Sequence, residues 1–338
     1  MPRSSFTQPD NRVIDSSSNR HVMALTLDSS TAYRRGLLRC ITSRIGDVSI
    51  KGYIDKSKLY QVEGDLLHYT IGDSLMMRGE QELIDAIGKR EEFLGFEDPD
   101  IWFDDATSIV HIYFTIPFLH SARPKHTSVH LGHASGRDLQ SLVITSPLLS
   151  PSADVPKGAK ELVVMPKNRN NIRLNLVESF ALGERQHYHS VIRVAIAENP
   201  DRDWQFGDII FHPKTDGHTW CNGHVSPGPV FPAEFINIGK GKVVGVINGR
   251  EANQYDGEKV RYGRFAIGLM IYDYDNGKIE WVSKVPWIVD SEAKNITFAS
   301  QFVQTGQNEG LLYAHVDDSF VRAYKINAAG ITELLYRL

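Results

Sequence analysis

The sequence predicts an all-β protein, a five-bladed β-propeller whose blades are four-stranded antiparallel sheets. Short strand-like runs separated by turns follow one another in groups of four, and helical patterns are scarce. The second strands of the four clear groups align at Val110, Leu174, Val243 and Leu312, which lie 64, 69 and 69 residues apart. A four-stranded unit that repeats at a steady period is typical of a β-propeller. A pair of β-sandwiches is the alternative, but it would not by itself produce this even step.

The expected strands can be assigned in chain order. A faint first group comprises residues 22–27, 36–44, 47–54 and 59–66. Four clear groups follow: 99–103, 109–115, 127–133 and 142–148; 160–165, 172–180, 190–197 and 205–211; 228–238, 242–248, 264–273 and 279–285; and 295–303, 310–316, 320–326 and 331–335. One helical pattern covers 80–93, interrupted by Gly88. Residues 1–20, rich in Ser, Asn and Asp, are expected to be a flexible tail, and residues 21–338 a single propeller domain.

Composition excludes several classes of function. The chain has 37 basic and 41 acidic residues and a formal net charge of −4, which gives no support for a nucleic-acid or anionic-membrane partner. Its apolar runs are too short to cross a bilayer, and the first residues lack the apolar core of a secretory signal. Two cysteines, Cys40 and Cys221, do not suggest a disulfide scaffold. We therefore expect a soluble, cytoplasmic protein, whose oligomeric state the sequence does not indicate.

The loop lengths predict which face carries the function. Links between first and second strands are short and those between second and third strands are long, so the long loops share one face with the entrances of the first strands. The polar residues expected around this mouth are Arg44, Glu97, Asp98, Arg123, Lys125, His126, Lys160, Glu161, Glu184, Arg185, His187, His189, Asn248, Arg250, Glu251, Arg261, Tyr262, His315, Asp317 and Asp318. This mixture of carboxylates with Arg, Lys, His and Tyr suits a polyhydroxylated or anionic ligand, although a single Arg or Lys in a long loop is usually only solvated.

The segment Glu97-Asp98-Pro99 carries the most specific signal in the chain. Proline restricts the preceding residue to extended conformations, so Asp98 is expected at the entrance of an inner strand with a fixed backbone direction. A carboxylate held there is a candidate for acid–base chemistry. The simpler interpretation is an acidic turn before an ordinary strand. Four histidines between residues 120 and 133 cross a loop and enter a strand, so their spacing does not predict a set of converging metal ligands, and we expect no metal.

Several short motifs resemble, in the same order, those of glycoside hydrolase family 130. Glu97-Asp98-Pro99 resembles its E-D-P-R segment, residues 226–231 its Gly-Pro-Pro turn, residues 262–273 its Tyr-x-x-Gly-Ala-x-Leu-Leu-Asp segment, and residues 311–317 a strand end with Asp. Lys160-Glu161 stands where the family has Lys-Asp. The resemblance implies a five-bladed propeller that acts on β-mannosides as a phosphorylase or a hydrolase. It implies Asp98 as general acid, Asp317 as a sugar-hydroxyl contact, and Arg44 and Lys160 as polar contacts.

Two departures from this family favour hydrolysis over phosphorolysis. Asp100 replaces the arginine of E-D-P-R, and Asn248 stands where phosphorylases have a histidine. Both changes make the site less cationic, whereas phosphate binding relies on charge-assisted hydrogen bonds. The run from Asp98 to Asp105 also resembles a segment of family 43, the inverting arabinanases and xylosidases. The family 43 acid, a glutamate in a Glu-Gly-Pro turn, is missing here because the turn reads Pro227-Gly228-Pro229.

The resulting hypothesis is an inverting enzyme that cleaves a glycosidic bond in a β-mannoside-type oligosaccharide. Asp98 is the expected acid, and Glu178, Glu251 and Glu161 are candidates for the second carboxylate that an inverting hydrolase needs. We expect substrate contacts from Arg44, Glu97, Lys160, Glu161, Asn248, Arg250, Tyr262 and Asp317, and no cofactor, with inorganic phosphate as co-substrate if the reaction is phosphorolysis. The alternative from another class is an inactive propeller that binds a glycan or a protein.

Overall fold

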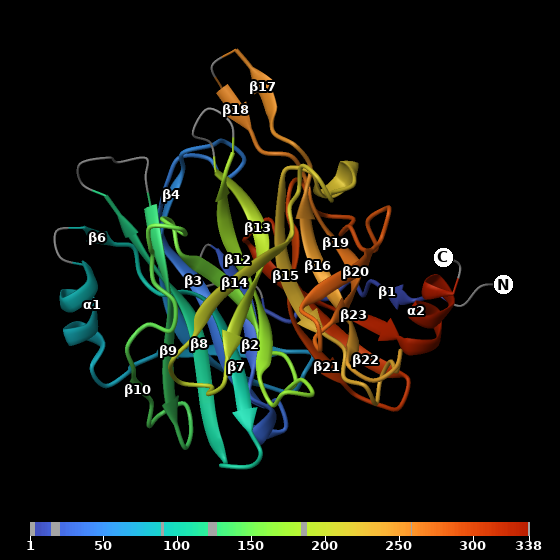
Figure 1. Ribbon diagram of the computed structural model, residues 1–338, viewed down its shortest axis with the longest axis horizontal. Coiled ribbons are helices and arrows are strands. Elements are labelled where there is room, and N and C mark those ends of the chain that lie inside the picture. The colour runs from blue at the N-terminus through green and yellow to red at the C-terminus, as the bar shows by residue number, and fades with distance from the viewer. Residues whose placement is uncertain are drawn as a thin grey trace.

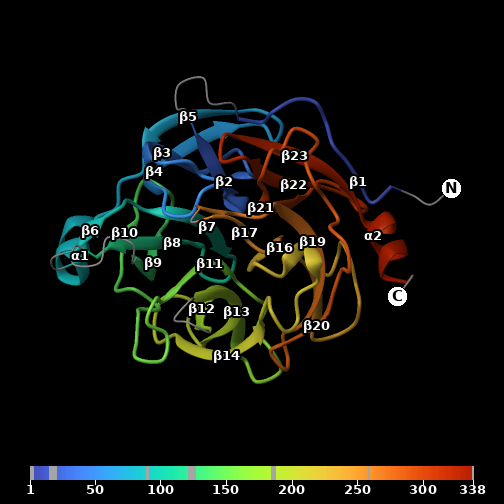
Figure 2. The same cartoon turned by 90° about the horizontal axis from the view of Figure 1, so that it is seen from above.

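The computed structural model describes residues 4–14, 21–88, 91–120, 127–183, 188–257 and 259–336. Within them, small antiparallel sheets of four strands each form the five blades of a propeller, as the repeat predicted. The innermost strands of the blades surround a common axis, and the sheets radiate outward from it (Figure 2).

The blades follow the chain order, each running from its inner to its outer strand. Blade I contains β2 (Val22–Leu27), β3 (Arg35–Ile45), β4 (Ile54–Gly64) and β5 (Tyr69–Ser74). Blade II contains β7 (Glu97–Asp104), β8 (Ile109–Leu119), β9 (Thr127–Gly136) and β10 (Val143–Ile144), and β6 (Glu92–Phe93) also pairs with β8. Blade III contains β11 (Ala159–Val163), β12 (Arg173–Leu182), β13 (Tyr188–Ala197) and β14 (Gln205–Phe211).

The last two blades carry additions to this plan. Blade IV contains β15 (His224–Val230), β16 (Lys242–Arg250), β19 (Phe265–Asp273) and β20 (Lys278–Val282), and the hairpin β17 (Gln254–Asp256)–β18 (Lys259–Arg261) is inserted before β19. This hairpin projects from one end of the molecule (Figure 1). Blade V contains β21 (Thr297–Gln304), β22 (Glu309–Val316), β23 (Phe320–Asn327) and β1 (Phe6–Thr7).

The apolar strands are explained by the way the blades stack. A strand near the axis is covered on both sides by neighbouring blades, so it is apolar on both faces instead of alternating. All six residues of β2 are buried, as are the nine central residues of β8. The main apolar clusters bring together residues of adjacent blades: Leu37 and Leu59 of blade I, for example, share a cluster with Ile112 and Phe114 of blade II. This burial of apolar surface between blades stabilises the ring.

Two groups of strands differ from their prediction. In blade I the expected strand at 47–54 is mainly a loop, because Gly46 and Gly52 adopt positive φ angles of 94° and 102° that end β3 and delay β4. In blade V the expected fourth strand at 331–335 is part of helix α2 (Ala328–Leu335), whose first turn is capped by the Asn327 side chain. The first helix, α1 (Glu80–Gly88), stops at the glycine that interrupts the predicted pattern.

The N-terminal segment closes the ring. β1 pairs with β23, with Phe6 opposite Ile326, and takes the outer position of blade V that the C-terminal residues were expected to fill. Val13 and Ile14 are buried in the same region. The expectation of a flexible tail is therefore wrong for the described residues 4–14. None of the helices in the described ranges is long and apolar enough to cross a bilayer.

Candidate active site at the propeller mouth

The innermost strands share an irregularity that shapes the site. In each blade the pairing between the first and second strands shifts by one residue, which places a β-bulge near the entrance of the inner strand. Three bulge residues that are not glycine have positive φ angles: Ala24 (49°), Asp98 (48°) and Glu161 (50°). A bulge redirects a side chain out of the regular alternation. Two carboxyl groups from adjacent blades are thereby brought to equivalent positions around the axis.

A cavity of about 180 Å³ lies on the propeller axis beside these bulges. All five inner strands contribute to its lining, which includes Asp98, Asp100, Glu161, Gly228 and Ser300. Burial raises the pKa of Asp100 to about 7, although the Ile101 N–H and the Thr26 hydroxyl favour its charged form. The residue that replaces the family's arginine therefore contributes a buried carboxyl group to the axial cavity.

Arg39 holds the acidic pair that the sequence singled out. This buried side chain of β3 donates to Asp98 Oδ1 (Nη1, 2.7 Å), Glu97 Oε1 (Nη2, 2.5 Å) and the Ser57 hydroxyl (Nε, 2.9 Å). Burial opposes the charged form of Asp98, but Arg39 and then Lys160 lower the pKa of Asp98 below its ordinary value. Burial dominates at the neighbouring carboxyl and raises the pKa of Glu97 to about 7.

Arg39 was not predicted as a site residue, although its sequence context indicates that it is buried. The run Leu37-Leu38-Arg39-Cys40-Ile41 places one charge in an apolar strand, and a charge in such a position needs a buried partner. The run does not say which carboxylate that partner is.

The Asp98 carboxyl group is also hydrogen-bonded to that of Glu161. Burial, and then the negative charge of Asp98, raise the pKa of Glu161 well above its ordinary value. Two carboxyl groups can be hydrogen-bonded to each other only when one of them carries a proton, because an ionised carboxylate can only accept hydrogen bonds.

Glu178 is the centre of a second charged group. Its carboxylate accepts from the Ser190 hydroxyl (2.9 Å) and contacts His224 Nε2 (3.1 Å) and Lys160 Nζ (3.8 Å). Burial alone would raise the pKa of Glu178, but His224 and Lys160 lower it to about 2. The side chain of Glu178 is fully buried, and its contacts hold Lys160 and His224 in place.

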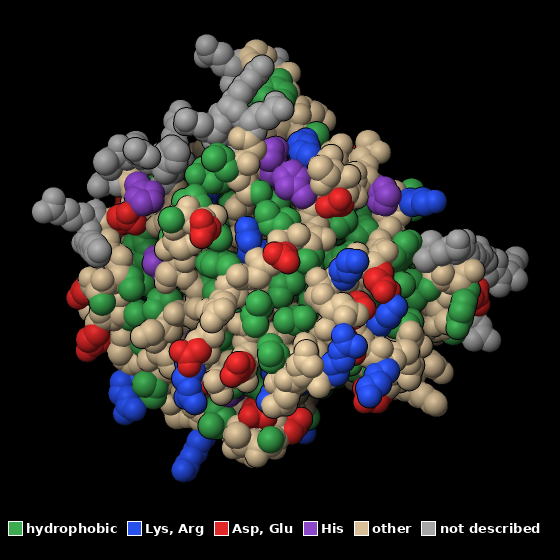
Figure 3. Space-filling model, viewed as in Figure 1, with side chains coloured by type: hydrophobic (Ala, Val, Ile, Leu, Met, Phe, Trp, Pro, Cys, Tyr) green, Lys and Arg blue, Asp and Glu red, His purple; other side chains and the backbone are tan. Residues whose placement is uncertain are grey.

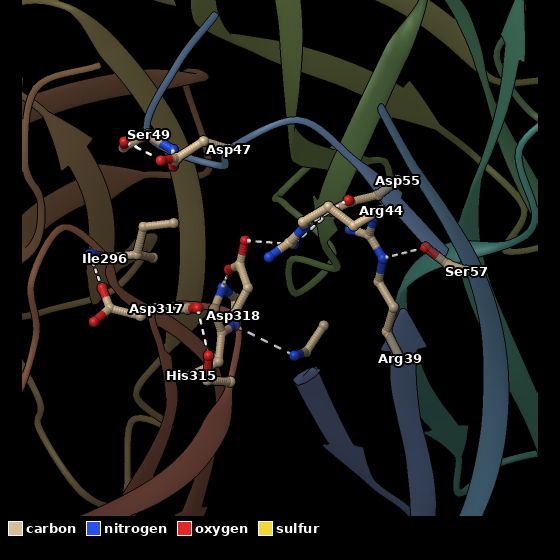
Figure 4. Close-up of polar contacts among 12 residues, drawn as sticks. Arg39, Arg44, Asp47, Ser49, Asp55, Ser57, Ile296, His315, Asp317 and Asp318 are labelled. Atoms are coloured by element: carbon tan, nitrogen blue, oxygen red, sulfur yellow. Dashed lines mark hydrogen bonds and ion pairs between the residues drawn. The ribbon is translucent and has the colours of Figure 1, made fainter. Parts of the chain in front are cut away.

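A third charged group occupies the side of the mouth formed by blades I and V (Figure 4). Arg44 makes a bidentate pair with Asp55 (2.7 and 2.6 Å) and lies 3.7 Å from Asp318 Oδ2. Asp318 Oδ1 is 3.4 Å from His315 Nε2, and Nδ1 of that ring accepts from the backbone N–H of Ala24. Burial raises the pKa of Asp318 to about 6 against the opposing charges of Arg39 and Arg44.

Three residues predicted for the site have other roles. The Asp317 carboxylate accepts hydrogen bonds from the backbone N–H groups of Lys294, Asn295 and Ile296, each at 2.8 Å. It therefore fixes the segment that leads into β21. The charged group at the mouth contains its neighbour Asp318 instead. Asn248 is fully buried and bonds both backbone groups of Ala299. Glu251 is exposed and accepts from the Arg264 N–H. The predicted mouth residues in 121–126 and 184–187 lie outside the described residues.

Two tyrosines span the mouth from non-adjacent blades. The loop 46–53 of blade I pairs with the end of the blade IV hairpin, through an Ile50–Arg261 bridge and the hydrogen bond from Tyr262 N to Ser49 O. The rings of Tyr53 and Tyr262 meet edge to face at 6.4 Å. The Arg250 guanidinium lies 4.4 Å from the centre of the Tyr262 ring. This strap gives the mouth an amphipathic aromatic wall, which suits the apolar face of a sugar.

Comparison with known proteins identifies this architecture. No family model and no curated protein matches the sequence. Solved structures match over nearly the whole chain: a β-1,2-mannobiose phosphorylase from Listeria innocua (TM-score 0.66, 13% identity, 98% of this chain and 99% of that chain) and a glycosyl hydrolase from Bacteroides ovatus (TM-score 0.66, 16% identity, 96% and 94%). A mannose phosphorylase from Leishmania mexicana matches with TM-score 0.57, 12% identity and coverage of 96% and 90%.

The chain shares the five-bladed fold of mannoside phosphorylases and related glycosidases. This confirms the structural resemblance indicated by the order of the motifs. At these identities the likeness establishes the fold, and the function has to be argued from the site itself.

Proposed function

We propose that this protein is an inverting glycosidase that cleaves a β-mannoside-type oligosaccharide, with the proton supplied by the carboxyl pair of Asp98 and Glu161. The observation that carries the proposal is the position of these two carboxyl groups, which lie at the mouth on neighbouring bulges and both line the axial cavity. The opposite directions of their pKa shifts support a proton held between them. Such a group can protonate a leaving glycosidic oxygen. The shared fold supports a carbohydrate substrate, since one structural neighbour was solved with β-1,2-mannobiose.

The pairing of the cations favours hydrolysis over phosphorolysis. Arg39 is bonded to Glu97 and Asp98, and Arg44 is bonded to Asp55. A phosphate would have to compete with these carboxylates for its charge-assisted hydrogen bonds. Inorganic phosphate therefore remains the co-substrate of a less favoured variant.

Asp318 is the best candidate for the base that activates water. It comes from blade V, which is adjacent to neither blade II nor blade III in the ring, so it approaches the mouth from a different side than Asp98 and Glu161. Its pKa of about 6 leaves it ionised at neutral pH, as a base requires. Of the three earlier candidates, Glu178 is fully buried, Glu251 is exposed, and Glu161 belongs to the proposed acid pair, so none is as well placed.

The test is product analysis on a panel of β-mannoside, β-xyloside and arabinoside oligosaccharides, with and without phosphate. We expect phosphate-independent release of sugar with inverted anomeric configuration, followed by NMR, and loss of activity in the Asp98→Asn/Glu161→Gln double variant. Asp318→Asn should also be inactive. Sugar phosphate as the product would support phosphorolysis. Calorimetric binding of an oligosaccharide without turnover would favour the inactive glycan-binding alternative. Full activity in the double variant would disprove the role of the pair.

A further inference from the structure

We propose that Glu161, rather than Asp98, carries the proton given to the leaving oxygen, and that Asp98 is the ionised partner that keeps the proton on Glu161. This inference rests on the proposed glycosidase function, and it assigns the acid to a different residue from the one that the motif resemblance implies.

The geometry makes the two carboxyls equivalent in position but different in surroundings. Both residues occupy the bulge of an inner strand with nearly equal φ angles, 48° and 50°, and both line the axial cavity. Residues other than glycine rarely adopt this backbone conformation, and the strain persists only where the surrounding structure holds the residue in place. The two bulges thereby direct the carboxyl groups of Asp98 and Glu161 into the same cavity from adjacent blades.

The neighbouring cation decides which carboxyl is ionised. Arg39 donates to Asp98 Oδ1 at 2.7 Å, and the Asp98 side chain is only 6% exposed. A guanidinium hydrogen bond of this kind stabilises the charged form of its acceptor. Asp98 is therefore the carboxylate of the pair.

Glu161 lacks this support. Lys160, its neighbour along β11, pairs with Glu178 of β12 in the same blade, with 3.8 Å between the ammonium nitrogen and Oε2. No ion pair to Glu161 is present among the described residues, and its hydrogen-bond partner is the anion Asp98. The shared proton consequently resides on Glu161, which donates it to Asp98 in the resting site. The directions of the two pKa shifts, downward for Asp98 and upward for Glu161, agree with this assignment.

The catalytic step follows from this placement. The O–H bond of Glu161 breaks and its proton goes to the glycosidic oxygen, while the bond between that oxygen and the anomeric carbon breaks with its electron pair remaining on the oxygen. The oxygen of a water molecule bonds to the anomeric carbon, and the proton lost by the water goes to the Asp318 carboxylate. Glu161 is left ionised and Asp318 protonated; Asp318 then releases its proton to solvent and Glu161 takes one up, which restores both groups. Asp98 is a positioning residue, because it acts through Glu161.

Infrared difference spectroscopy locates the proton without any substrate. A protonated carboxyl absorbs separately from carboxylates, so the band present at neutral pH should be diminished in Glu161→Gln. Glu82→Gln, at an exposed position of α1, is the control that should leave the band unchanged. In Asp98→Asn the band should lose its intensity at a lower pH, because the neighbouring charge that favours protonation is gone. Because Glu97 and Asp100 also have raised pKa values, the deciding quantity is the loss of band intensity. An intensity unchanged in Glu161→Gln but reduced in Asp98→Asn would overturn the assignment.

Kinetics then tests the chemical role. Glu161→Gln should lose about 10²–10⁴-fold in kcat/KM on an alkyl glycoside, the usual contribution of an acid. It should lose less than tenfold on a dinitrophenyl glycoside, whose leaving group needs no proton. Asp98→Asn should lose less activity on the alkyl glycoside than Glu161→Gln, with its alkaline limb shifted at least one pH unit lower. An unshifted limb, or equal losses of Glu161→Gln on both substrates, would contradict the proposal. If no glycoside is cleaved at all, the proposed function fails while the infrared result still decides where the proton lies.

Discussion

Replacing Arg39 with methionine tests whether a buried cation organises the mouth. Methionine keeps much of the volume of the side chain but removes the partner of two carboxylates. Glu97 and Asp98, with side chains 15% and 6% exposed, would remain in place without their ion pairs. Removing one member of a buried ion pair costs about 3–5 kcal/mol, because the charges left behind are desolvated and unpaired. For a chain of 338 residues the entropy of unfolding is roughly 0.7 kcal/mol per degree, so Tm should fall by about 4–7 °C.

The pH dependence separates charge from packing. In the wild type the pKa of Asp98 is lowered, so the contribution of the pair to stability is present above the ordinary carboxyl pKa and is lost as pH falls through the lowered value. In Arg39→Met burial raises the pKa of the carboxyl groups, so they become neutral well above pH 4. The deficit of the variant should therefore be largest at pH 7 and should narrow toward pH 4.

Scanning calorimetry at pH 7, 5.5 and 4 measures this effect. The control is Arg35→Met, an exposed arginine at the start of the same strand, for which a change within about 0.5 kcal/mol is expected. A deficit below about 1 kcal/mol, or one that is the same at pH 7 and pH 4, would refute the reasoning. The guanidinium would then act through packing, and the ionised state assigned to Asp98 would lose its main support.

Three further predictions follow from buried polar groups. Burial and the adjacent His111 lower the pKa of His133 to about 3, so the folded protein excludes a proton that the unfolded chain binds below pH 6.5. Between pH 6.5 and 5 the wild type should therefore lose about 1.6 kcal/mol more stability than His133→Gln, as measured by urea titration. Asp317→Ala should lower Tm because three backbone N–H groups lose their acceptor; an effect on activity alone would contradict this structural role. Arg322→Met should destabilise the protein by about 3–5 kcal/mol, because the fully buried Arg322 side chain links the N-terminal segment to blade V. If the N-terminal segment of the variant resisted proteolysis as well as that of the wild type, this role of Arg322 would be wrong.

The sequence alone predicts those features that are local or periodic. The four-stranded repeat, the start of the helix at Glu80 and the position of Asp98 at an inner-strand entrance follow from apolar runs, turn residues and a proline. The helix was predicted to reach residue 93 but ends at Gly88, and the extended backbone predicted for Asp98 is wrong because the bulge gives it a φ of 48°. The face of the mouth follows from loop lengths, because alternate links of an antiparallel meander lie on opposite faces. The prediction of strands was weakest in blades I and V. In blade I, Gly46 and Gly52 form a loop where a strand was expected, and in blade V the outer strand is supplied by the N-terminal segment.

The chemistry of the mouth depends on contacts that no local pattern encodes. Arg39 lies 59 residues before Asp98, and their contact exists only because two blades stack. Asp317 and Asp318 are adjacent residues with similar positive φ angles, so the alternation of a strand cannot tell which one enters the charged group. Similarly, the bulges at Asp98 and Glu161 break the regular alternation of inner strands that the sequence pattern assumes. The sequence thus determined that carboxylates gather at this mouth. The tertiary structure decided which of them are paired, buried or protonated, because burial and neighbouring charge set the ionisation of each group.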